Sequence, residues 1–126
     1  MRRTTAPDPN ASHARIYSHW RHLPAFNTLV PLSRCILDDM LMQFTRHEGN
    51  KQRLTANQIV RKYRVGHKTA RNAIVALEER GWIQRIGLAQ GKTGQAGGEY
   101  EIMCLTPMGK PCRGPFDDWV KPDDRK

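Results

Sequence analysis

The sequence predicts a mainly α fold with a small β-hairpin, and three observations lead to this prediction. Two amphipathic segments, residues 55–64 and 67–80, are separated only by Val65-Gly66, which predicts two short helices joined by a tight turn. Strand-like residues 82–86 and 100–105 flank a glycine-rich stretch, which is typical of a hairpin with a flexible tip. An apolar stripe further upstream predicts another helix, so three helices would form the core beside the hairpin.

The length of 126 residues suits one domain with one modest core. Residues 1–11 are polar and contain two prolines, so we expect them to be disordered. We assign residues 12–105 to the domain, including an N-terminal extension helix, and residues 106–126 to an irregular, proline-rich C-terminal tail. Within this tail, Phe116 and Trp119 are expected to fold back onto the domain.

Two helices are predicted upstream of the tight turn. Apolar residues spaced by three and four positions predict a short helix over residues 12–23, which Pro24 ends. Residues 26–30 read as an extended lead-in, and a longer helix follows over residues 32–46. The predicted buried stripe of the longer helix consists of Leu32, Cys35, Ile36, Met40, Leu41 and Phe44.

The next helix has the clearest start signal in the chain. Thr55 is the expected N-cap, and Gln58 three residues later completes a capping box. Leu54 before the cap and Ile59 after it can form a hydrophobic staple. Gly81 is expected to end the following helix in the left-handed conformation.

The helix over residues 67–80 has two faces of different chemistry. One side is small and apolar, which suits close packing, and consists of Ala70, Ala73, Ile74 and Leu77. The opposite side is mostly polar and presents Lys68, Arg71, Asn72, Val75 and Glu79.

The charge distribution favours a polyanionic partner. The net charge is +9, and the segment from Lys51 to Lys92 contains ten Lys or Arg residues against Glu78 and Glu79. This segment therefore holds most of the excess positive charge. The three cysteines include no C-x-x-C pair and are expected to be reduced, idle thiols, with Cys35 in the core of a helix.

The pattern Leu54-Thr55-x-x-x-Ile59, with Val65-Gly66-x-x-Thr69-Ala70-Arg71 and Gly81-Trp82-Ile83 after it, resembles winged helix-turn-helix DNA-binding domains of bacteria over about residues 30–105. The layout is also similar to short winged-helix proteins of prophages, plasmids and other mobile elements, including regulatory and replication proteins. This resemblance implies a three-helix core with a two- to three-stranded wing. It also implies binding to double-stranded DNA, with residues 67–80 as the recognition helix.

The candidate DNA contacts fall into three groups. The candidate base-reading residues are Lys68, Arg71, Asn72 and Val75. Lysine or arginine can donate to guanine, asparagine can pair with adenine, and valine can touch a thymine methyl group. The candidate backbone contacts are Arg61, Arg64, His67, Thr69, Arg53 and Arg85. The candidate wing contacts are Gln90, Lys92 and Gln95.

No catalytic, cofactor or metal site is predicted, so we expect a protein that is not an enzyme. The five histidines lack cysteine or carboxylate partners at ligand spacing. Residues 87–93 approach a phosphate-binding P-loop, but three residues rather than four separate the glycines, and no helix follows. No candidate nucleophile has a nearby base and an orienting group.

These observations favour a sequence-specific DNA-binding protein that regulates transcription of a mobile element. Palindromic operators would require a homodimer. One alternative is a replication-initiation or partition accessory protein. Another, of a different class, is a winged-helix interaction module that inhibits a host nucleoprotein complex through a protein partner. No apolar run approaches the ~20 residues of a membrane span, and no secretory signal is recognisable, so a cytoplasmic, nucleoid-associated location is expected.

Overall fold

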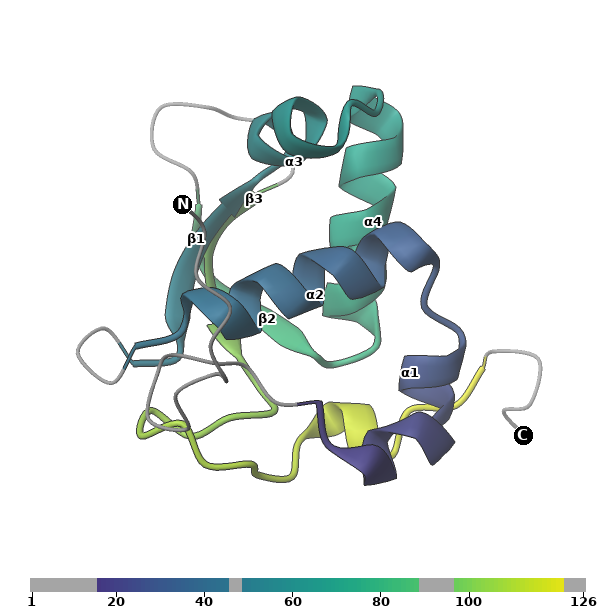
Figure 1. The fold of residues 1–126 in the computed structure, drawn as a ribbon, viewed down its shortest axis with the longest axis vertical. Helices are drawn as coiled ribbons and strands as arrows, with labels where there is room; N and C mark the ends of the chain where they lie inside the picture. Colours follow the sequence, from purple (N-terminus) through teal and green to yellow (C-terminus); the bar gives the residue numbers. More distant parts are fainter. Residues whose placement is uncertain (1–15, 46–48, 89–96, 122–126) are drawn as a thin grey trace, which may run out of the picture.

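The computed structural model describes residues 16–45, 49–88 and 97–121 (Figure 1). Within these ranges the chain combines four α-helices, two 3-10 helices and a three-stranded antiparallel sheet, an α+β arrangement. The elements in chain order are η1 (Ser18–His22), α1 (Pro24–Asn27), α2 (Pro31–Gln43), β1 (Lys51–Thr55), α3 (Ala56–Tyr63), α4 (His67–Glu79), β2 (Ile83–Leu88), β3 (Gly97–Ile102) and η2 (Pro115–Asp117). The segment expected to be disordered, residues 1–11, lies outside the described residues.

The N-terminal extension differs from the prediction. Ser18–His22 forms a 3-10 helix, and Pro24 begins helix α1 instead of ending a helix. The predicted extended lead-in over residues 26–30 is therefore wrong at its first two positions. The physical reason is that proline suits the first turn of a helix, where its missing N–H would have no intrahelical acceptor.

Helix α2 begins at Pro31, one residue before the predicted start, and ends at Gln43. The prediction that Cys35 belongs to the core is wrong, because its side chain is exposed. Ser33 is buried instead, and its hydroxyl donates to the carbonyl oxygen of Ala73 in α4 at 2.9 Å. A buried serine satisfied by the neighbouring helix cannot be recognised from apolar periodicity alone.

The capping features predicted around α3 and α4 are confirmed. The backbone N–H of Gln58 donates to Thr55 Oγ1 at 3.3 Å, and that of Thr55 donates to Gln58 Oε1 at 3.0 Å. Gly81, which follows the C-cap residue Arg80 of α4, has φ of +87° and so adopts the left-handed conformation. The four residues predicted to face the core from α4 are each at most 2% exposed: Ala70, Ala73, Ile74 and Leu77.

The sheet has the order β1-β3-β2, with β3 hydrogen-bonded to both neighbours. Strand β1 was not predicted, since no strand was expected between the helix over residues 32–46 and the Thr55 cap. The hairpin strands lie closer to the tip than predicted, at residues 83–88 and 97–102. Asn50 secures the entry to β1, since its buried side-chain amide donates to the carbonyl oxygens of Ile102 at 3.1 Å and Leu105 at 2.9 Å.

The described part of the tail completes the hydrophobic core, as expected for Phe116 and Trp119. The rings of Phe116 and Trp82 stack at 4.3 Å, and the Trp82 indole N–H donates to the carbonyl oxygen of Ala25 at 3.0 Å. Trp20 packs edge-on against Trp82 at 5.4 Å. Figure 1 shows the consequence, in that η2 lies beside α1 below the sheet. The segment before α2 and the segment after β3 therefore contribute to the same aromatic cluster.

Gly81→Ala is expected to destabilise the protein by about 2–4 kcal/mol, because two costs combine there. The left-handed backbone disfavours a side chain, and an added Cβ would lie 2.6 Å from Pro115 Cβ and 2.7 Å from the Phe116 nitrogen. Gly87→Ala is the control, since its added Cβ would meet the nearest atom, Glu99 Cβ, at 3.7 Å. Chemical denaturation measures both variants, and equal stability of the two would contradict the close approach at Gly81.

Candidate nucleic-acid interface

The outer side of helix α4 is exposed along its length. Lys68, Arg71 and Asn72 are exposed, and Val75 is 47% exposed although it is apolar. The opposite side packs against α2 and the rest of the core. All four predicted base-reading residues therefore lie on one solvent-facing side of α4, and the opposite side of this helix is packed into the core.

The surface of α3 beside α4 is cationic. Arg61 and Arg64 are exposed, and the sequence from Asn50 to Leu77 contains no acidic residue. His67 and Thr69, in the first turn of α4, are also exposed. These positions bring the predicted backbone contacts of α3 next to the start of α4.

The beginning of α4 has no side-chain cap. Gly66 is the N-cap residue, and α3, by contrast, has a complete capping box. The first N–H groups of a helix have no acceptor within the helix, and they form the positive end of the helix dipole. An uncapped start flanked by His67 and Lys68 is therefore suited to a phosphate group.

Arg64 is the one non-glycine residue with positive φ in the described ranges, at φ 55° and ψ 50°. It ends α3, and its N–H donates to the carbonyl oxygen of Val60 at 2.9 Å. A residue with a side chain in this conformation costs on the order of 1 kcal/mol relative to glycine. The chain therefore has an arginine, with its long cationic side chain, at a position where glycine would fit the backbone conformation better.

Three other cationic side chains between Lys51 and Lys92 have partners within the protein. Lys62 Nζ forms an ion pair with Asp39 Oδ2 at 2.8 Å, and the Tyr63 hydroxyl donates to the same carboxylate. Arg80 stacks over Trp119 at 4.6 Å and donates from Nε to the Thr28 hydroxyl at 2.8 Å. Arg85 donates to the Tyr100 hydroxyl at 3.3 Å. The sequence could not reveal these pairings, since the partners are distant in the chain.

The hydroxyl of Tyr100 also affects the ionisation of Arg85. The hydrogen bond between them raises the pKa of the Arg85 guanidinium further above its ordinary value. Arg85 is half-buried on β2, so it forms part of the sheet surface rather than of a freely mobile cationic patch. Its positive charge is still the charge that a contact with a DNA phosphate requires.

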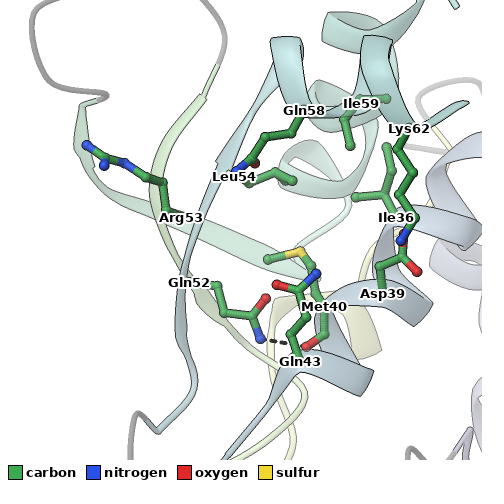
Figure 2. A pocket seen from close by; sticks show the side chains of 10 residues that line it. All are labelled: Ile36, Asp39, Met40, Gln43, Gln52, Arg53, Leu54, Gln58, Ile59 and Lys62. Atoms are coloured by element: carbon green, nitrogen blue, oxygen red, sulfur yellow. Dashed lines mark hydrogen bonds and ion pairs between the residues drawn. The ribbon is translucent and has the colours of Figure 1, made fainter. Parts of the chain in front are cut away.

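The structure does not bring Arg53 to the α3–α4 surface. Together with Gln52 and Leu54 it lines a hollow of about 190 Å³ between α2, β1 and α3, but Figure 2 shows its side chain pointing away from the centre of this hollow. Successive side chains of a strand point to opposite faces. Arg53 instead lies opposite Glu99 of β3 in the sheet register. The predicted wing residues Gln90, Lys92 and Gln95 lie outside the described residues.

The contacts around the hollow shown in Figure 2 explain how α3 is positioned against α2 and β1. Gln52 Nε2 donates to the carbonyl oxygen of Met40, and Ile36, Leu54 and Ile59 form the apolar part of the lining. The Lys62–Asp39 ion pair lies at one side of the same hollow. These contacts fix α3 relative to α2 and so fix the direction in which Arg61 and Arg64 point.

Comparison with known proteins gives no match for this chain among family models, curated proteins or solved structures. Among the described residues, no helix has the length and apolar character needed to cross a membrane.

Proposed function

We propose that this protein is a winged helix-turn-helix protein that binds duplex DNA sequence-specifically and regulates transcription of a mobile element. The observation that carries the proposal is the exposed side of α4, where Lys68, Arg71, Asn72 and Val75 form one continuous stripe. These residue types match the chemistry of base edges in the major groove. The packed alanines on the other side leave the stripe free to enter the groove.

The order of elements supports the proposal. Helices α3 and α4 are separated by three residues, and the antiparallel strands β2 and β3 follow them. In a helix-turn-helix, the second helix enters the major groove while the first crosses the sugar–phosphate backbone. Here α4 would be the recognition helix, α3 the crossing helix, and the β2–β3 hairpin the wing.

Affinity and selectivity would come from different side chains. Arg61, Arg64 and the uncapped start of α4 would neutralise phosphates, which releases counterions and favours every duplex alike. Lys68, Arg71 and Asn72 would discriminate between base pairs. Glu79 is also exposed on this helix, but at its C-terminal end, about three helical turns from the phosphate-binding start.

Recovery and sequencing of genomic DNA bound by the protein tests the proposal. We expect a small set of related sites at promoters of the element that encodes the protein. Enrichment of a replication origin alone would replace regulation by a replication role. Tight capture of a host protein by a chain without measurable DNA affinity would contradict the proposal and favour an interaction module.

Arg64→Gly is expected to separate stability from binding. The free energy of unfolding of the variant should be higher by about 0.5–1 kcal/mol, because glycine adopts the left-handed conformation without strain. Its affinity for all duplexes should fall, because one phosphate contact is lost. Thermal unfolding and fluorescence anisotropy measure the two effects. A variant that is less stable and binds DNA normally would contradict both assignments of Arg64.

A further inference from the structure

The solvent-facing side of α2 has no role in the proposed DNA interface. It presents Pro31, Arg34, Cys35, Asp38 and Met42, all of them exposed, and the N-cap residue Val30 extends it. Met42 is 68% exposed and Val30 is 53% exposed, high values for apolar side chains. Single exposed apolar residues are common on protein surfaces, so these two indicate a contact surface only together with an apolar hollow on the same face.

An open hollow of about 390 Å³ lies at the N-terminal end of this face. Ile16, Phe26 and Leu29 form its apolar lining together with Pro31, while Arg34, Cys35 and Asp38 form its rim on α2. The guanidinium carbon of Arg34 lies over the Phe26 ring, 4.2 Å from its centroid. The hollow is suited to a flexible apolar side chain such as methionine.

The charges on the rim are not paired within the described chain. No ion pair and no side-chain hydrogen bond joins Arg34 or Asp38 to another residue in the described ranges, although the guanidinium of Arg34 has the Phe26 ring as a partner. Burial and the neighbouring Asp39 raise the pKa of the Asp38 carboxyl, and Arg34 one helical turn away offsets this only in part. A cation from outside the protomer would relieve this.

The residue spacing makes the face complementary to itself. If two copies of α2 pack antiparallel about a two-fold axis level with Ile36, residues whose numbers are equally far above and below 36 face each other. Arg34 then faces Asp38 of the second copy, and Val30 faces Met42 of the second copy. Each Met42 also lies near the hollow bordered by Leu29 and Pro31.

We propose that the outer face of α2 is a homodimer interface, in which Arg34 pairs with Asp38 of the second copy and Met42 enters the hollow between its α1 and α2. The arrangement is isologous, so each contact occurs twice. Cys35 lies one residue from the axis level, so the two thiols are offset by only about 3 Å along the helices. The interface uses no residue of the proposed DNA-reading stripe.

Sedimentation of the full chain from about 1 to about 500 µM tests the dimer, because an interface built from one helix face is small and is expected to have moderate affinity. Met42→Lys should raise the dissociation constant about 30-fold or more, because a charged side chain would replace the apolar one that enters the hollow in both copies. Met108→Lys is the matched control, since Met108 is 60% exposed but lies outside α2. Wild-type protein that remains monomeric throughout this range would overturn the proposal.

Charge exchange tests the predicted pairing directly. Arg34→Glu or Asp38→Arg alone should weaken the dimer about 10-fold or more, because like charges then face each other. The double variant restores opposite charges and should return to within about threefold of wild type. A double variant as weak as the singles would overturn the antiparallel register.

Cys35 supplies an internal reporter. A short bismaleimide should cross-link wild type and Cys112→Ser but not Cys35→Ser, so that the half-buried thiol of Cys112 is excluded as the source. Cross-linking that survives Cys35→Ser would contradict the proposed axis. Because Lys68→Ala/Arg71→Ala should lose DNA selectivity but remain dimeric, failure of the DNA proposal is distinguishable from failure of this one.

Discussion

The double variant Lys68→Ala/Arg71→Ala is expected to lose about 2–6 kcal/mol of affinity for the cognate site, as two base contacts would contribute. Its affinity for unrelated duplexes should fall much less, because the remaining phosphate contacts still act on any sequence. Both side chains are exposed and far from the core, so the fold should not change. Fluorescence anisotropy with cognate and scrambled duplexes measures the difference.

Arg61→Ala is the matched control for this prediction. It removes an exposed cation from α3, so it should weaken cognate and scrambled duplexes alike and reduce the slope of log K against log salt by about 1. If the Lys68/Arg71 variant instead weakened both duplexes equally, these residues would be phosphate contacts and α4 would not read bases.

Trp82→Ala is expected to destabilise the protein by about 3–5 kcal/mol, a large part of the stability of a domain of this size. Trp82 is fully buried, stacks on Phe116 and donates to the carbonyl oxygen of Ala25. Its removal would leave a cavity where the segments before and after the sheet meet. Denaturant unfolding followed by circular dichroism measures the loss.

Ile86→Ala, on strand β2 directly after Trp82, is the control for the tryptophan variant. Ile86 is 42% exposed, so this substitution should change the unfolding free energy by less than about 0.5 kcal/mol. A Trp82→Ala protein as stable as Ile86→Ala would show that the tail does not complete the core.

The elements with local signals were predictable. The capping box of α3, the glycine after α4 and the alanine side of α4 depend on residues close together in sequence, and the structure has them as predicted. Strand β1 has no such signal, because it is only five residues long and its last residue is the Thr55 cap of α3. Its pairing with β3 depends on residues almost fifty positions away.

The candidate site shows the same division. Exposure of Lys68, Arg71, Asn72 and Val75 follows from helical spacing alone, and it is found. The position of Arg53 depends on the sheet register, and the neutralisation of Lys62 depends on Asp39 of another helix. Charge counted along the sequence therefore overstated the number of cations available to a phosphate backbone.

Methylation protection of guanine N7 on recovered genomic sites tests the central claim most directly, because N7 lies in the major groove. The account predicts that wild-type protein and Arg61→Ala protect the same short run of guanines, and that Lys68→Ala/Arg71→Ala no longer protects them. Protection of the same guanines by the Lys68/Arg71 variant, at concentrations that saturate the DNA, would contradict the account.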